Sequence, residues 1–200
     1  MNAQPHRKLV KHHHSPGDFH ELTFSTYRRL PLLTNDVWRA ELSRSINQAN
    51  ETLHFELVAF VYMPEHVHLL VFPLLPNPEI SVYLATIKQL LSRFVHHSLE
   101  HTKSPLLKKL IIRERPSKFC FRFWQEGGGF DRNLFTPKAI QASIDYIHRN
   151  PVKRNMCKRA VDYRWSSARY YLAEPTQQQS EGLPKIQGLR SEVFENDMSR

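Results

Sequence analysis

With 200 residues, the chain is long enough for one compact domain with extensions and too short for two full domains. Its 40% hydrophobic and 24% charged residues give a globular balance, and Lys and Arg exceed Asp and Glu by nine, which favours a polyanionic partner, nucleic acid before membrane. The two cysteines lack paired metal spacing and the apolar runs 57–63 and 69–75 are shorter than the ~20 residues of a bilayer span, so a disulfide framework, a Cys-based zinc site and a membrane helix are excluded.

We expect residues 1–17 to form a basic, flexible leader. They contain no apolar segment of a secretory signal peptide, which together with the two thiols favours a cytoplasmic protein with no membrane partner. A single domain is expected over residues 18–173. The polar residues 174–200 show little periodicity, so we expect a disordered tail.

The first half of the domain predicts a strand, a helix and a hairpin. Alternation around Leu22 and Phe24 predicts the strand, and a helix capped by Asn35 or Asp36 follows it. Two β-rich runs, "LHFELVAFVYM" and "HVHLLVFPL", are separated only by Pro64 and Glu65. This spacing predicts a β-hairpin in the middle of a sheet.

The second half predicts a helix, a strand and a last helix. Apolar residues recur at helical spacing over 80–94, and a basic, poorly periodic stretch at 103–118 follows. The segment "FCFRFWQEGGGFDRNLF" is expected to hold the last strand and a loop, in which glycines 127–129 make a turn or a close backbone approach. Thr136 and Pro137 start the last helix, which is expected to end near Asn150 because Pro151 follows.

The predicted order is therefore strand, helix, strand, strand, helix, strand, helix. A central hairpin with a crossover helix on either side is typical of the split βαβ arrangement. We expect an α+β, ferredoxin-like fold with an antiparallel sheet and helices packed on one face.

Two histidines stand at the head of the second hairpin run. Residues two apart in a strand point to the same face, so His66 and His68 project side by side. An arbitrary His-x-His is more often a solvated pair, but the apolar context of this strand demands a reason for two imidazoles. Two neutral imidazoles suit Zn, Mn, Fe or Ni and leave room for a third protein ligand and a substrate oxygen.

The last helix carries a candidate third ligand. Tyr146 and Asn150 are four residues apart and lie one above the other on a helix. If this helix crosses the sheet face that displays the histidines, the Asn150 amide oxygen can complete the metal shell, with the Tyr146 phenol beside it. Taken singly, Tyr146 fits a half-buried aromatic and Asn150 a helix cap, and only the combination indicates a site.

The combined motifs resemble a known family. "YMPEHVHLLV", then "FWQEGGGFDRNLF", "YIHRNPVKR" and "WSSARYY" in this order resemble the single-tyrosine HUH transposases, and more narrowly the REP-associated tyrosine transposases of bacteria. The resemblance covers residues 19–172. It implies that His66 and His68 are metal ligands, that Asn150 stands at the third ligand position, that Mg²⁺ or Mn²⁺ is the metal, and that Tyr146 is the nucleophile.

The chemistry implied is cleavage of single-stranded DNA by transesterification. A tyrosine attacks the scissile phosphate, which leaves a 5′-phosphotyrosine and a free 3′-hydroxyl, and reversal by another 3′-hydroxyl joins strands. The resemblance also implies hairpin-forming repeats as the preferred DNA. Relatives in insertion sequences are dimers that exchange the tyrosine helix, whereas the REP-associated branch can act as a monomer, so a monomer or a homodimer is expected.

Binding a single strand requires cations along a groove and aromatic faces for bases. Phe123 and Trp165 are further aromatic candidates for stacking. The residues that we expect to bind DNA are Lys88, Arg93, Arg122, Arg132, Arg149, Lys153, Arg154, Arg169 and Trp124.

Two other functions are open from sequence alone. A ferredoxin-like sheet can bind nucleic acid without cutting it, which would leave Tyr146 idle. A metal-dependent phosphodiesterase could instead use water, with Tyr146 as a bystander. The second alternative predicts no protein–DNA adduct.

Overall fold

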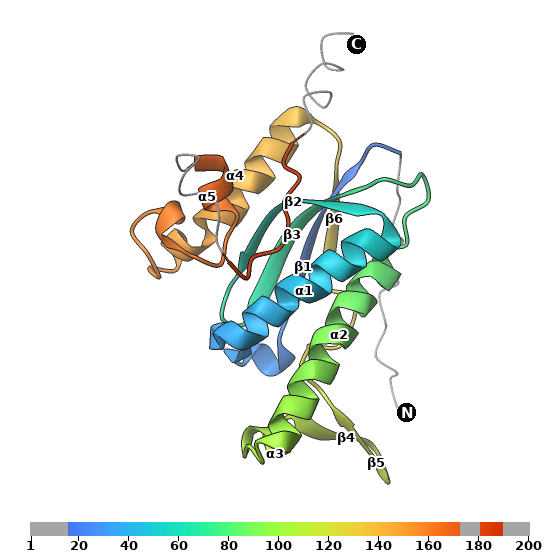
Figure 1. Ribbon diagram of the computed structural model, residues 1–200. Coiled ribbons are helices and arrows are strands. Elements are labelled where there is room, and N and C mark those ends of the chain that lie inside the picture. Colours follow the sequence, from blue (N-terminus) through green and yellow to red (C-terminus); the bar gives the residue numbers. More distant parts are fainter. Residues whose placement is uncertain (1–15, 173–180, 190–200) are drawn as a thin grey trace, which may run out of the picture.

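The computed structural model describes residues 16–172 and 181–189. A four-stranded antiparallel sheet with the order β2-β3-β1-β6 forms the centre of the fold (Figure 1). This order is the one that a split βαβ arrangement produces, so the predicted α+β, ferredoxin-like fold is confirmed. The strands are β1 (Phe19–Ser25), β2 (Phe55–Tyr62), β3 (His66–Pro73) and β6 (Phe130–Leu134).

Helices cover both faces of this sheet. α1 (Asp36–Leu53) and α2 (Ile80–His101) pack beside each other on one face (Figure 1), where the Tyr62 and Ser43 hydroxyls are 3.2 Å apart. α4 (Pro137–Lys153) packs against the other face. The expectation of helices on one face is therefore correct for α1 and α2 and wrong for α4. The physical reason is that β2 and β3 are apolar on both faces of the sheet, so each face must be covered by a helix.

The helices α1 and α4 begin as their sequences predict. The Asn35 side chain accepts hydrogen bonds from two backbone amides of α1, and the Thr136 hydroxyl accepts one in α4, whose first residue is proline. α4 runs to Lys153 and does not end near Asn150. Pro151 is buried and starts a last turn that backbone hydrogen bonds close, including that from Arg154 N to Asn150 O (3.1 Å).

A second, two-stranded sheet was not predicted. α3 (Leu106–Leu110) follows α2, and β4 (Ile111–Arg115) pairs with β5 (Lys118–Phe121). This hairpin projects from the body at the end of α2 (Figure 1). Sequence periodicity missed it because its residues are mostly exposed, so that neither face shows an apolar pattern.

The glycine segment makes both a turn and a close approach, as expected. Gly127 and Gly129 have positive φ angles of 100° and 88°. A Cβ atom at Gly129 would overlap the backbone carbonyl oxygen of Thr23 in β1, whereas Gly128 faces open space. Gly129 therefore lets the chain enter β6 directly against β1.

Residues 181–189 pack along the outer edge of the main sheet. Gln187 N donates to Leu57 O (3.0 Å), and Leu57 N donates to the Gln187 side chain (3.1 Å). The expectation of a disordered tail is wrong for this segment. The segment is ordered because β2 is an edge strand, and the outward-facing backbone groups of an edge strand need hydrogen-bond partners.

The other predicted tail residues and the leader up to residue 15 lie outside the described residues. Among the described helices, none combines the length and the apolar character of a membrane span. The short helices are η1 (Tyr27–Arg29), η2 (Leu32–Thr34), η3 (Ala160–Asp162) and α5 (Ala168–Leu172).

Candidate metal centre and tyrosine helix

His66 and His68 project from β3 toward the α4 face of the sheet. Both are buried, at 6% and 4% exposure, and their ring centroids are 4.8 Å apart. Two imidazoles that bind one ion through nitrogens about 2.1 Å away would have centroids roughly 4.5–5.5 Å apart, depending on the angle between them at the ion. The histidine pair thus has the spacing of two ligands to one ion.

Each histidine is held through its Nδ1 atom. His66 Nδ1 donates to the Glu65 carboxylate (3.1 Å), and His68 Nδ1 is 2.8 Å from the hydroxyl of Thr23 in the neighbouring strand β1. Contacts of this kind fix ring orientation and tautomer in metal sites. They leave the Nε2 atom of each ring to take a ligand.

Burial keeps the two rings neutral. Burial, and then the charge of His66, lowers the pKa of His68 to about 3, and burial also lowers the pKa of His66. Burial acts to raise the pKa of Glu65, but the hydrogen bond from Arg154 and the charges of His66 and Arg154 hold it below its usual value. At neutral pH the site therefore has two imidazole lone pairs beside an ionised carboxylate.

α4 brings Tyr146 to the histidine pair and carries Asn150 one turn further along the same helix. The Tyr146 ring lies edge-on to His68 with the centroids 5.4 Å apart, and 41% of this residue is exposed. Asn150 is 9% exposed, and its Nδ2 donates to Tyr146 O (2.9 Å). This bond uses the amide nitrogen and leaves the Oδ1 atom as an acceptor for another partner. The predicted condition, that the tyrosine helix crosses the face bearing the histidines, is met.

The donor set fits a divalent cation. Two imidazole nitrogens and one amide oxygen are ligands that such ions accept, and an exposed phenol beside them leaves room for a substrate oxygen. Within the described residues no group of three His, Cys, Asp or Glu side chains forms a metal cluster. The Asn150 amide oxygen is the candidate that the sequence offers for a third protein ligand.

Three side-chain links fasten α4 to the sheet. Ser143 Oγ donates to the buried Glu21 carboxylate (2.8 Å), and Arg154 Nη1 donates to Glu65 (2.7 Å). His148 Nε2 lies 2.8 Å from Ser167 Oγ, which also accepts from the backbone amide of Phe60 in β2 (2.9 Å). Two links within α4 and one just beyond its C-terminal end hold Tyr146 in a fixed position relative to the histidines.

The predicted DNA-binding cations are divided between several sites. Arg149 and Lys153 are exposed on α4, with the Lys153 ammonium 5.0 Å from the Tyr146 ring centroid, and Arg93 is exposed on α2 across the sheet. Others bind within the protein, which reduces their availability to DNA. These are Arg122 with Glu114 and Glu126, Arg132 with Glu21, Arg154 with Glu65, Arg169 with the Val161 carbonyl, and Lys88 with the Gly127 carbonyl.

The predicted stacking aromatics lie in the core. Trp124 is 6% exposed, packs against Phe24 and Phe123, and donates its indole N–H to Lys88 O (3.1 Å). Phe123 and Trp165 are buried as well. The prediction that Trp124 stacks on bases is wrong, because neighbouring side chains already cover its ring. Lys88, whose carbonyl accepts the Trp124 indole N–H, is itself partly buried, and burial lowers the pKa of its ammonium group to about 8.

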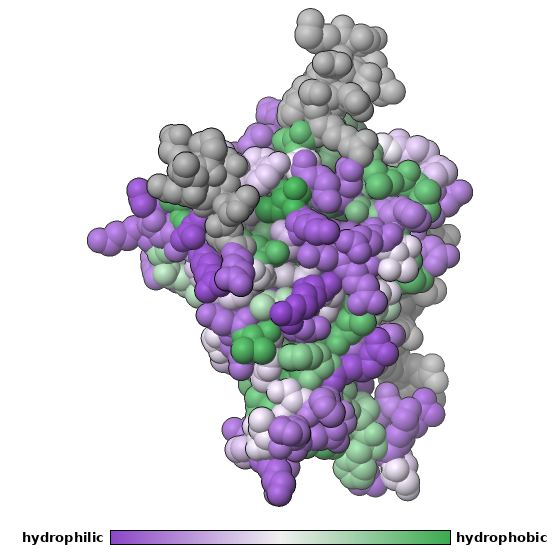
Figure 2. Space-filling model, viewed as in Figure 1, coloured by the Kyte–Doolittle hydropathy of each residue, from purple (hydrophilic) through white to green (hydrophobic). Residues whose placement is uncertain are grey.

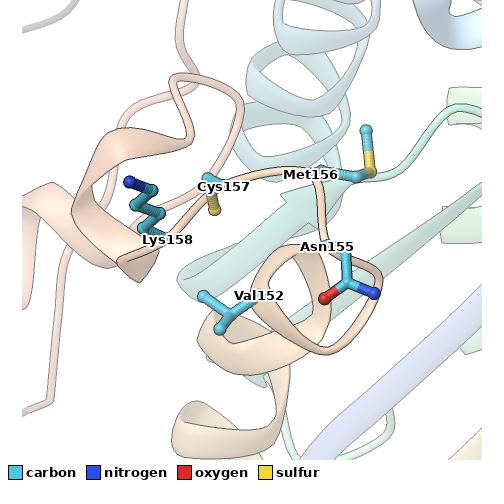
Figure 3. Close-up of a pocket in the computed structure, with 5 residues that line it drawn as sticks. All are labelled: Val152, Asn155, Met156, Cys157 and Lys158. Atoms are coloured by element: carbon cyan, nitrogen blue, oxygen red, sulfur yellow. The ribbon is translucent and has the colours of Figure 1, made fainter.

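A hollow of about 570 Å³ lies at the end of α4 rather than at the histidines (Figure 3). Its lining contains no histidine or carboxylate, and Figure 3 shows the side chains spread around the turn that follows the helix. The hollow therefore lacks the groups that the chemistry needs. Its lining residues are Val152, Asn155, Met156, Cys157 and Lys158.

Comparison with known protein families identifies the first part of the domain. Residues 18–112 match the family model described as "Transposase IS200 like". This region belongs to the IS200-like transposase family. The match contains His66 and His68 and ends before α4, so Tyr146 and Asn150 lie beyond it. Membership of this transposase family implies DNA binding and use of a divalent metal ion.

One solved structure extends the likeness in fold over most of the chain. A REP-associated tyrosine transposase bound to a REP hairpin matches with a TM-score of 0.63 and 20% identity, over 92% of this chain and 98% of that one. A putative transposase from Deinococcus radiodurans R1 matches with a TM-score of 0.43 and 20% identity, over 74% and 97% of the two chains. No curated protein matches the sequence.

Sequence reasoning missed the residues that support the site. Glu65 directly precedes His66, and that adjacency was the only local signal of its role. Thr23 and Ser167 lie 45 and 19 residues from the histidines that they contact. The "WSSARYY" motif marked the region of Ser167 but did not indicate its partner, because only the fold brings the two together.

Proposed function

We propose that this transposase is a metal-dependent, single-stranded DNA endonuclease and strand transferase that cuts through Tyr146. The contact of the Tyr146 ring with His68 carries the proposal, because it places a nucleophile beside a pair of metal-ligand candidates. His66, His68 and Asn150 would bind Mg²⁺ or Mn²⁺. When bound, the ion would polarise the scissile phosphate and offset the charge that develops on it.

The residues of the chain perform the covalent step. The Tyr146 phenol loses its proton, and its oxygen forms a bond to phosphorus while the bond from phosphorus to the 3′-oxygen breaks. The departing 3′-oxygen takes up a proton, and the phosphate stays on Tyr146 as a 5′-phosphotyrosine. Attack by a second 3′-hydroxyl reverses these steps and joins the strands without a nucleotide cofactor.

Positioning is the main contribution of the fold to this reaction. The links from α4 to Glu21, Glu65 and Ser167 restrict the approach of the phenol to the phosphate, which is the kind of orientation that accelerates a displacement. Lys153 lies over the Tyr146 ring and is placed to meet a phosphate there. Arg149 extends the positive charge along the exposed side of the same helix.

All four site residues come from one chain. The histidines on β3 and the tyrosine helix α4 meet within the same chain, which supports a site built without a helix from a second copy. We therefore favour a monomer as the cutting unit over a dimer with exchanged helices. The proposed DNA is single-stranded with hairpin-forming repeats, in line with the REP hairpin bound by the structurally similar transposase.

A covalent adduct tests the proposal. Purified protein is mixed with labelled hairpin DNA from the flanks of the gene and Mn²⁺, and the products are run on a denaturing gel. Wild type and the matched control Tyr170→Phe, an exposed tyrosine on α5, should give a shifted covalent band, and Tyr146→Phe should give none. Cleavage by Tyr146→Phe would establish the water-based phosphodiesterase instead, and binding without cleavage by wild type would establish the binding module.

A further inference from the structure

Residues 103–122, here called the basic arm, carry most of the excess positive charge of the protein. The arm consists of the end of the α2–α3 connection, α3 and the β4–β5 hairpin. It contains seven Lys or Arg residues and one Glu, a net charge of +6, whereas the whole chain has +9. A tenth of the sequence therefore holds two thirds of the net charge.

The arm is exposed as well as charged. Every residue from 113 to 119 is exposed, and Phe119 at 64% is among the most exposed hydrophobic residues of the described chain. In Figure 2 the arm, at the bottom of the view, shows apolar green beside hydrophilic purple. A two-stranded hairpin is only marginally stable by itself. This one also exposes an aromatic ring, Phe119, next to its charged turn, and an exposed apolar group of this kind can mark an interaction surface.

The base of the arm is ordered by a few specific contacts. Phe121 packs against His96 of α2 with the ring centroids 4.6 Å apart, and Arg122 N donates to Leu110 O (2.7 Å). Glu114, the single acidic residue, pairs with Lys118 (2.7 Å) and Arg122 (3.6 Å) across the hairpin. These contacts support the hairpin from its base, and the remaining cations of the arm outnumber its acidic group.

We propose that the basic arm is a second DNA-binding surface, which binds the double-stranded stem of the hairpin whose single-stranded flank enters the tyrosine site. A two-stranded β-ribbon has a size that the major groove of DNA admits, and cations on its strands and on α3 can reach the flanking phosphates. A surface for single strands would instead need several exposed stacking aromatics, whereas Phe119 is the one strongly exposed aromatic of the arm.

The arm and the tyrosine site lie at different places on the molecule. In Figure 1 the arm is at the bottom, beyond α2, and α4 is at the upper left on the other face of the sheet. DNA that contacts both must cross the body of the protein. The arm therefore suits recognition of a structured DNA, and it leaves the chemical step to α4.

The inference rests on the proposed function for the choice of DNA, but its test measures binding and not cleavage. A triple variant, Arg113→Gln, Arg115→Gln and Lys118→Gln, is compared with a matched triple that removes three exposed cations elsewhere, Arg44→Gln, Lys158→Gln and Lys185→Gln. Both are made in the Tyr146→Phe protein, so that no adduct forms. The probes are a flank oligonucleotide with its hairpin stem, the same flank without the stem, and the stem duplex alone.

The arm variant should bind the stem-bearing DNA and the duplex at least about tenfold more weakly than the matched triple, with a salt dependence shallower by up to about three, since each lost phosphate contact removes roughly 0.9 from the slope. Its affinity for the stemless flank should be unchanged. Equal affinities of the two triples for the stem would overturn the proposal, and so would an equal loss on the stemless flank. A separate failure of wild type to form an adduct would reject only the tyrosine chemistry.

Circular dichroism spectra of both triple variants show whether they fold like the parent protein. A single variant then separates the role of the ring from that of the cations. Phe119→Ser removes the exposed ring and keeps every charge. It should weaken duplex binding with no change in salt dependence. A changed salt slope in Phe119→Ser would contradict the separation of roles between the cations and the ring.

Discussion

The tyrosine helix and the basic arm are attached to the same domain in opposite ways. α4 lies on the sheet and is fastened by side-chain links to Glu21, Glu65 and Ser167, all of them buried. The arm stands away from the sheet, and residues 113–119 are exposed throughout. Chemistry at phosphorus needs a nucleophile fixed within a fraction of an ångström, whereas phosphate contacts along a duplex tolerate freedom, and the two regions reflect this difference.

The largest expected effect is on the ligand pair next to α4. Either His66→Ala or His68→Ala should abolish DNA cleavage and Mn²⁺ binding, because one remaining imidazole with one amide oxygen is too weak a donor set. Isothermal calorimetry with Mn²⁺ and the adduct gel measure the two losses. His97→Ala, an exposed histidine on α2, is the control and should behave as wild type. Normal cleavage by the double histidine variant would refute the site.

A smaller effect is expected at the residue that joins the histidine strand to α4. Glu65 accepts from His66 Nδ1 and from Arg154 at the end of the helix, so it orients a ligand and holds the nucleophile at once. Glu65→Gln should reduce Mn²⁺ affinity about 10- to 100-fold, as loss of a partner that orients a ligand does in metal sites.

Calorimetry without DNA measures Mn²⁺ affinity separately from catalysis. The matched control is Glu41→Gln, a carboxylate that pairs with Arg44 on the outer side of α1. Its Mn²⁺ affinity should equal that of wild type. An unchanged affinity in Glu65→Gln would mean that His66 is oriented by packing alone.

The smallest expected effect compares the stability of the two regions directly. Ser167→Ala leaves the buried His148 ring and the Phe60 amide without their common partner, which should cost about 1–2 kcal/mol of unfolding free energy. Phe119→Ser, at the exposed end of the arm, should change it by no more than about 0.5 kcal/mol. Urea denaturation measures both. Equal losses would show that the arm is as firmly integrated into the fold as α4.

The sequence by itself determined the main elements, and it predicted the central residues of the candidate site. Hydrophobic periodicity and capping residues such as Asn35 and Thr136 act through neighbours along the chain, so strand, hairpin and helix order could be predicted from them. His66 and His68 are two apart in a strand, and Tyr146 and Asn150 are four apart in a helix. Local geometry alone places each pair on one face.

Only the tertiary structure decided how these pieces meet. α4 covers the face opposite α1 and α2, and the partners of its links are up to 122 residues away in sequence, as Ser143 and Glu21 are. Folding likewise buries Trp124 in the core and pairs Arg154 with the Glu65 carboxylate. The sequence showed the positive charge of the basic arm but did not predict its hairpin, because exposed strands lack the apolar alternation that burial imposes. Contacts between distant segments depend on packing, which no local pattern encodes.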